Sequence, residues 1–242
     1  DKPVVPGHEP VGRIVAVGSE VKNYQVGDRL LMQADWKHLR TPKSNAAFGY
    51  NFEGALQEYV VIDERCVVSE AGEEYLIRVS EAPSAAAIGL IEPWATVEGS
   101  YAWQERNHVA DGGRLLVVAN EEPHGIDALT ADHQPAEILT ISSKEISSVE
   151  GQSFDDIIYY GADADVIESL ARLLGSRSVF CVVLGGARID RPVGLDIGRV
   201  HYDFIRFVGT TGDNPADAYA WIPENGELRA GDKAAVLGAV GP

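Results

Sequence analysis

The stretch that decides the fold is Pro6-Gly7-His8-Glu9-Pro10-Val11-Gly12-Arg13-Ile14-Val15-Ala16-Val17-Gly18. A histidine and a glutamate stand side by side after a glycine, and the apolar run 14–17 behind them predicts a strand. An adjacent imidazole and carboxylate can supply two ligands to a borderline metal such as zinc. For a lone His-Glu pair, a strand-edge histidine beside a solvated glutamate is the favoured interpretation. The flanking Pro-Gly and the later Gly27-Asp28-Arg29 favour the metal interpretation instead.

The composition is that of a globular protein and excludes several function classes. Of the 242 residues, 45% are apolar and 24% are charged, which suits one large domain or two of ordinary size. No apolar run approaches the roughly 20 residues that a membrane span requires, and the residues after Asp1 lack the layout of a signal peptide. The net charge of −17 argues against nucleic acid and anionic membranes. We expect a cytoplasmic protein with neither kind of partner.

The two cysteines exclude some kinds of stabilisation within this chain. Cys66 and Cys181 are far apart, in apolar surroundings and without Cys-x-x-Cys spacing. A disulfide framework and an all-cysteine zinc site are both excluded by this pattern. We expect both to be buried spectator thiols.

Residues 1–105 are predicted to be mostly β, as in a barrel or sandwich, because short apolar runs alternate with Gly, Asp and Asn. The expected strands are 14–17, 29–32, 57–62 and 66–68. The segment 36–52 shows no periodicity and predicts a surface loop. Ser84 is the expected N-cap of a helix through the following alanines.

After residue 106 the pattern changes to that of a doubly wound α/β domain. Nearly continuous apolar runs fit strands buried on both faces, and a helical pattern at 164–174 intervenes. The expected strands are 115–118, 137–141, 156–160, 179–184 and 204–209.

An internal repeat aligns residues 112–123 with 231–242. Both copies look like the first strand of a nucleotide-binding unit leading into its phosphate turn, where glycines let the backbone approach a pyrophosphate. The first copy lacks those glycines, and Glu121 and Glu122 would repel the anion. We therefore predict a degenerate unit over 106–228 and the start of a second unit at 229–242, whose turn carries Gly238 and Gly241.

The Gly7-His8-Glu9 motif, the segment from Leu90 to Thr96 around Glu92-Pro93, and the late glycines together resemble the zinc-dependent medium-chain dehydrogenases of alcohols and polyols. The sorbose-phosphate-reductase-like branch is the nearest in layout. The resemblance implies a GroES-like β-rich barrel domain over 1–105, whose first part would precede Asp1, and then a Rossmann-like doubly wound domain. It also implies a homodimer or homotetramer acting on a small molecule.

The implied activity is hydride transfer between NAD or NADP and a secondary alcohol or ketone of a sugar, sugar phosphate or polyol. One catalytic zinc would be held by His8, Glu9 and Glu92, with a cysteine from upstream. For Glu92, a helix-breaking Glu-Pro corner is an equally open interpretation. The segment 33–53, where many relatives carry a four-cysteine zinc lobe, has no cysteine, so we expect no structural zinc.

The cofactor would bind through Gly238 and Gly241, with Thr210 as a neighbour of the nicotinamide. An ordinary strand-ending turn is the other interpretation of Thr210, and the more favoured one. Two alternatives to the main reading remain: a zinc-free reductase of the same superfamily, and a non-catalytic scaffold or binding descendant. We also expect residues 1–242 by themselves to be inactive.

Overall fold

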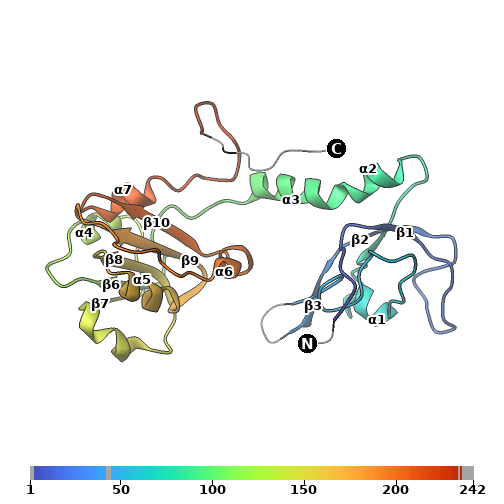
Figure 1. The fold of residues 1–242 in the computed structure, drawn as a ribbon, viewed down its shortest axis with the longest axis horizontal. Coiled ribbons are helices and arrows are strands. Elements are labelled where there is room, and N and C mark those ends of the chain that lie inside the picture. The colour runs from blue at the N-terminus through green and yellow to red at the C-terminus, as the bar shows by residue number, and fades with distance from the viewer. Residues whose placement is uncertain (1–2, 42–44, 234, 236–242) are drawn as a thin grey trace. The chain divides into compact units, whose positions relative to one another are not determined.

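The structure is a computed structural model that describes residues 3–41, 45–233 and 235. The chain separates into two compact units, Asp1–Ser100 and Tyr101–Pro242, called unit 1 and unit 2 below (Figure 1). Within the described residues, none of the helices has the length and apolar character that a membrane crossing requires.

Unit 1 is rich in short β-strands around its own core. A three-stranded antiparallel sheet has the order β1-β2-β5, and β3 pairs with β4 in a separate hairpin. Trp36, Phe48 and Val67 are each only 1% exposed and form the centre of the core. The elements are β1 (Val11–Arg13), β2 (Arg29–Met32), β3 (Asp35–Arg40), β4 (Asn45–Ala47), α1 (Glu64–Val67), β5 (Leu76–Arg78), α2 (Ala85–Gly89) and α3 (Ile91–Ala102).

Two of the predicted strands in unit 1 are wrong. Residues 14–17 follow β1 as an irregular segment, and residues 57–62 are irregular as well. Ile14, Val60 and Ile62 pack against the core without forming a strand, whereas Val15 is 62% exposed and Val61 is 98% exposed. By contrast, the strand predicted at 29–32 is confirmed with the bounds of β2.

Two further segments of unit 1 differ from the prediction for a local reason. Residues 64–67 form the short helix α1 in place of part of the strand predicted at 66–68, because the Asp63 side chain accepts a hydrogen bond from the Arg65 amide and caps it. The predicted loop 36–52 contains most of the β3–β4 hairpin, which Trp36 and Phe48 anchor in the core. The helix expected after Ser84 is confirmed as α2, with the Ser84 hydroxyl accepting from the Ala87 amide at 3.1 Å.

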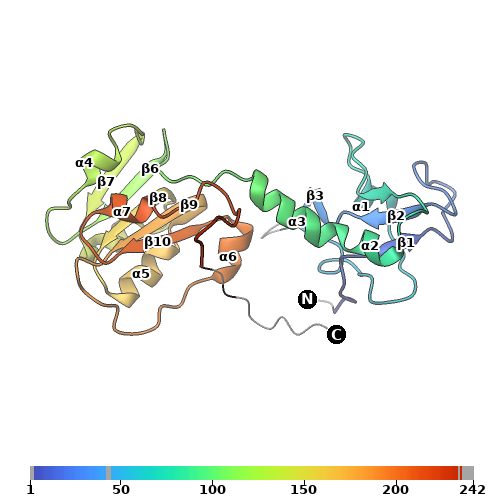
Figure 2. The same ribbon diagram turned by 90° about the horizontal axis from the view of Figure 1, so that it is seen from above.

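Unit 2 is the doubly wound α/β domain that the sequence predicts. Its five strands are all parallel in the order β10-β9-β8-β6-β7 (Figures 1 and 2). The first and third strands in sequence, β6 and β8, are neighbours, so the order reverses between them. The elements are β6 (Arg114–Val118), α4 (Ile126–Leu129), β7 (Glu137–Ile141), the 3₁₀ helix η1 (Ser143–Val149), β8 (Phe154–Tyr160), α5 (Ala164–Ala171), β9 (Leu174–Val183), α6 (Ile197–Tyr202), β10 (Arg206–Thr210) and α7 (Pro215–Tyr219).

Both faces of this sheet are buried, which explains the continuous apolar runs. Leu116 and Val118 point to the face covered by α5 and η1, whereas Leu115 and Val117 point to the face covered by α4 and α7. All four side chains are at most 1% exposed. Four of the five residues of β6 therefore need an apolar side chain, and the sequence shows no polar alternation from Leu115 to Val118.

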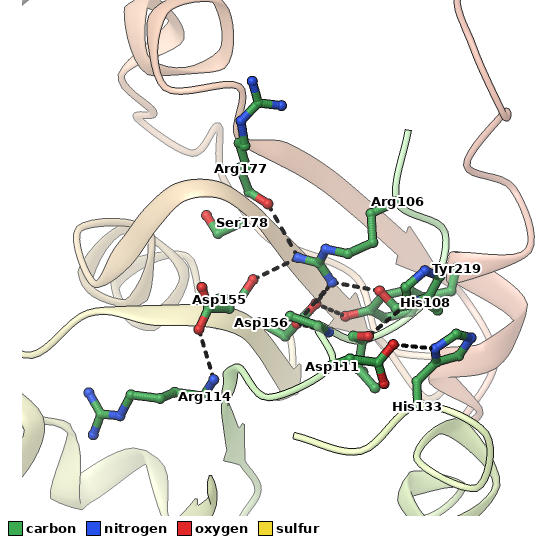
Figure 3. Close-up of polar contacts among 12 residues, drawn as sticks. Arg106, His108, Asp111, Arg114, His133, Asp155, Asp156, Arg177, Ser178 and Tyr219 are labelled. Carbon is green, nitrogen blue, oxygen red and sulfur yellow. Dashed lines mark hydrogen bonds and ion pairs between the residues drawn. The ribbon is translucent and has the colours of Figure 1, made fainter. Parts of the chain in front are cut away.

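One charged group lies inside this sheet. Asp156 in β8 is 1% exposed and accepts hydrogen bonds from Arg106 Nη1 at 2.7 and 2.9 Å, from the Ala110 amide at 2.8 Å and from the Tyr219 hydroxyl at 2.8 Å (Figure 3). Burial raises the pKa of the Asp156 carboxyl, and the Arg106 guanidinium opposes that shift. Through these hydrogen bonds the Asp156 carboxylate connects the segment before β6 and helix α7 to the centre of the sheet.

We expect Arg106→Ala to lower the free energy of unfolding of unit 2 by about 3–5 kcal/mol, because the Asp156 charge would stay buried without its cation. Tyr219→Phe should cost only about 1 kcal/mol, since it removes one hydrogen bond. Urea denaturation of the two variants measures the difference. Equal losses would contradict a central role for the ion pair.

Candidate functional site

Unit 1 brings together the three residues that the sequence nominates as zinc ligands. The ligand atoms of His8, Glu9 and Glu92 all lie within 4.8 Å of one another. His8 Nε2 is 3.9 Å from a carboxylate oxygen of Glu9 and 3.9 Å from one of Glu92. The three come from the segment before β1 and from the first turn of α3, so they are distant in sequence and adjacent in space.

These distances fit a bound cation better than direct hydrogen bonds. A separation of 3.9 Å exceeds the 2.7–3.2 Å of a hydrogen bond. It is below the sum of two zinc–ligand bonds, which is about 4.1–4.3 Å. One imidazole and two carboxylates are also an acceptable donor set for zinc, and their two negative charges would balance the ion. The residues present therefore fit the metal that the sequence implies.

The backbone at His8 is held by an unusually close approach of neighbouring chain segments. A Cβ on Gly54 would lie 2.5 Å from the Gly7 carbonyl oxygen, and one on Gly49 would lie 2.7 Å from the same oxygen. Gly54 N donates to Val5 O at 2.7 Å, and Ala55 N donates to Gly7 O at 2.9 Å. This segment fixes the direction in which the chain leaves Gly7 and so positions His8.

Two other contacts complete the surroundings of the ligands. The Tyr50 ring packs at a tilt against the His8 ring, with centroids 5.4 Å apart. The end of α2 lies against the Glu9 backbone, since a Cβ on Gly89 would meet Glu9 O at 3.4 Å.

Pro93 falls inside the first turn of α3, where its missing N–H has no helical partner to lose. Because α2 ends at Gly89 and α3 begins at Ile91, a helix boundary lies just before Glu92-Pro93, and both interpretations of Glu92 stay open.

The first phosphate turn of unit 2 is built as a structural turn. The Ala119 amide donates to Ile141 O at 3.0 Å, and Asn120 Oδ1 accepts from the Ser143 amide at 3.1 Å and from its hydroxyl at 3.0 Å. The turn is thus bonded to the end of β7 and to the start of η1. The helix that follows, α4, has only four residues, and exposed Glu121 and Glu122 precede it. The loss of pyrophosphate binding in this copy stays a prediction.

Of the three predicted cofactor residues, Thr210 is among the described residues. Thr210 ends β10, where its hydroxyl accepts from the Gly212 amide at 3.0 Å and its carbonyl accepts from the Leu184 amide at 3.0 Å. That is the geometry of a strand-ending turn, and a role for Thr210 beside a nicotinamide stays a prediction. Gly238 and Gly241 lie outside the described residues.

Unit 2 holds one cluster that the sequence interpretation missed. His108, Asp111 and His133 place possible ligand atoms within 4.8 Å of one another. The only signal in the sequence is the spacing of three between His108 and Asp111, which is too common to stand out. His133 joins them through the tertiary fold.

We expect Gly54→Ala to disturb the His8 region, because a methyl 2.5 Å from the Gly7 carbonyl oxygen forces a backbone shift. The free energy of unfolding should fall by about 1–3 kcal/mol, and zinc binding at His8 should weaken. Gly12→Ala is the matched control, since nothing lies within 4 Å of its Cβ position. Urea denaturation and zinc titration measure both effects. If the two variants behave alike, the close approach does not position His8.

Comparisons with known proteins agree with the resemblance. Residues 1–71 match the alcohol dehydrogenase GroES-like domain family. Over most of its length the chain is 24% identical to mannitol-1-phosphate 5-dehydrogenase of Aliivibrio fischeri, covering 89% of the chain and 61% of that protein. It is also 24% identical to L-sorbose 1-phosphate reductase of Klebsiella pneumoniae, covering 91% of the chain and 63% of that protein. The chain thus spans about three-fifths of the length of these relatives.

A solved structure of similar layout is 2R,3R-butanediol dehydrogenase from Bacillus subtilis, with 17% identity over 88% of this chain and 66% of that one, at a TM-score of 0.35. At that TM-score the likeness does not support the assignment of the fold. The assignment rests on the strand order of unit 2 and on the family match of unit 1. Unit 1 thus contains an alcohol dehydrogenase GroES-like domain, unit 2 is Rossmann-like, and the chain as a whole is similar to a mannitol-1-phosphate dehydrogenase and a sorbose 1-phosphate reductase.

Proposed function

We propose that the protein to which this chain belongs is an NAD(P)-dependent oxidoreductase. It would transfer a hydride between the cofactor and a secondary alcohol or ketone of a sugar, sugar phosphate or polyol. The observation that carries the proposal is the convergence of His8, Glu9 and Glu92 from two segments of unit 1. The names of the two long matches, to enzymes of mannitol 1-phosphate and sorbose 1-phosphate, support a phosphorylated sugar or polyol as substrate.

His8, Glu9 and Glu92 are the residues that would hold a catalytic zinc. When bound, zinc acts as a Lewis acid on the substrate oxygen and lowers the pKa of a bound hydroxyl. His8 would contribute an imidazole lone pair, and the two glutamates would contribute negative charge that favours the cation. The side chains of His8 and Glu92 are 30% and 26% exposed, so a small molecule can reach them from solvent.

The cofactor part of the proposal uses the second copy of the repeat. Residues 106–228 would be a degenerate unit whose first turn serves only the fold, and residues 229–242 would begin the unit that binds NAD(P) through Gly238 and Gly241. We further propose a cytoplasmic homodimer or homotetramer, one catalytic zinc at His8 and no zinc in the cysteine-free segment 33–53. The net charge of −17 supports a partner that is neither nucleic acid nor an anionic membrane.

Zinc binding tests the metal part of the proposal. Wild-type chain should bind one more equivalent of zinc than His8→Ala, measured by metal analysis after dialysis. Glu92→Gln should weaken that equivalent about tenfold or more, because a carboxylate ligand is lost. Glu98→Gln is the matched control, since Glu98 is an exposed glutamate on the same helix α3. Equal zinc in wild type and His8→Ala would leave the zinc-free reductase as the better interpretation.

Fluorescence titration of the full-length protein with NADH and NADPH tests the cofactor part. Gly241→Asp should abolish binding, because it introduces a carboxylate and a side chain where the pyrophosphate approaches the backbone. Glu121→Gln with Glu122→Gln should leave binding unchanged, since the first turn is bonded to β7 and η1. If neither nucleotide binds the wild-type protein, the non-catalytic scaffold is the correct interpretation.

A further inference from the structure

The cluster of His108, Asp111 and His133 lies at the amino-terminal ends of the parallel strands of unit 2. His108 and Asp111 precede β6, which begins at Arg114, and His133 precedes β7, which begins at Glu137. In open parallel sheets, nucleotides bind at the opposite, carboxyl ends of the strands. The cluster therefore lies at the end of the sheet opposite to Thr210, which ends β10.

The backbone that carries these side chains is fixed from several directions. Val109, next to His108, is fully buried, and the Ala110 amide donates to Asp156 Oδ2 at 2.8 Å. Gly112 N donates to Gln134 O at 2.8 Å, so the turn at Asp111 is bonded directly to the loop at His133. The Asp156 ion pair and a backbone bond between the loops thus hold the three residues in place without any ligand (Figure 3).

The hydrogen bonds of the two imidazoles leave one nitrogen of each available. His108 Nδ1 lies 2.8 Å from the Val109 carbonyl oxygen, which can only accept, so Nδ1 carries the proton. His133 Nδ1 lies 2.9 Å from Asp111 Oδ2 and donates to that carboxylate. In both neutral rings the lone pair is then on Nε2. A ring N–H donated to a carbonyl or carboxylate is the usual outer partner of a metal-binding histidine.

A carboxylate lies beside the two rings. Asp111 Oδ2 accepts from His133 Nδ1, and Asp111 Oδ1 accepts from the Gln134 amide at 2.9 Å. The two imidazoles stack with centroids 3.6 Å apart and an interplanar angle of 10°. Two imidazoles, with a carboxylate as the outer partner of one of them, form a donor set for a borderline divalent metal.

We propose that the Nε2 atoms of His108 and His133 bind a divalent metal ion of the zinc type, with water in the remaining coordination positions and Asp111 as the outer partner of His133. The two rings would tilt apart from their stacked arrangement so that both Nε2 atoms face the ion. The metal then joins the segment before β6 to the loop before β7. This site is independent of the proposed activity and departs from the expectation of a single zinc.

The test is metal titration of the chain carrying His8→Ala, in which the site of unit 1 is removed. We expect one equivalent of zinc by calorimetry, and visible absorption of Co²⁺ in a site of low symmetry. Adding His133→Ala should abolish that equivalent. Adding Asp111→Asn, which keeps the size of the side chain, should weaken binding about tenfold or more. Zinc should raise the Tm of the His8→Ala chain and leave that of His8→Ala with His133→Ala unchanged.

The matched control is His201→Ala in the same His8→Ala background, because His201 is an exposed histidine on α6 of the same unit. It should bind zinc as tightly as the parent. The side chains of His133 and Asp111 are 35% and 61% exposed, so both substitutions should leave the fold intact, and far-UV circular dichroism checks this. Absence of bound zinc in the His8→Ala chain, or its retention in the His133→Ala variant, would overturn the proposal. Neither result would affect the equivalent assigned to His8.

Discussion

The close backbone approach at Gly7 is the constraint on which the candidate active site depends. Gly49 and Gly54 let two other chain segments lie against the Gly7 carbonyl at distances that no side chain tolerates. The hydrogen bonds from Gly54 to Val5 and from Ala55 to Gly7 then fix that segment in place. Because His8 follows directly, the backbone from which its imidazole projects is fixed. Such pre-organisation lowers the conformational entropy lost on binding, which would favour the metal that we propose.

Unit 2 depends on a different interaction, the buried ion pair between Arg106 and Asp156. The carboxylate lies at the centre of a parallel sheet whose other buried side chains are apolar apart from Ser178. Such a charge is tolerable only with its cation and several hydrogen bonds, and Arg106, Ala110 and Tyr219 supply them. The same bonds hold the segment that carries His108, so a structural ion pair and a candidate metal site share one support.

The first turn of unit 2, after β6, is held by hydrogen bonds within the protein. In a binding turn, the backbone amides and a helix N-terminus must be free for the phosphates. Here the Ala119 amide donates to Ile141 O at the end of β7, and the Asn120 side chain accepts from Ser143 at the start of η1. Two exposed carboxylates follow. These features support our proposal that the cofactor binds at the second copy of the repeat.

The sequence by itself determined the parts of this protein that depend on local pattern. Continuous apolar runs predicted the sheet of unit 2, because most positions of its central strands are buried on both faces, and Ser84 predicted the start of α2 through its cap. The motif Gly7-His8-Glu9 predicted the family domain of unit 1. Short apolar runs in unit 1 misled, because Ile14 and Ile62 pack on the core without forming a strand while Val15 and Val61 are exposed.

Only the tertiary structure decided which distant residues meet. Glu92 is more than 80 residues from His8 in the sequence, and the packing of α2 and α3 brings it within 3.9 Å of the imidazole. The hairpin at Trp36 forms because its aromatic side chain enters a core that no local periodicity reveals. His133 reaches Asp111 through the pairing of two loops at the end of a sheet. Side-chain clusters of this kind depend on contacts between segments, whereas a sequence pattern records the neighbours along one segment.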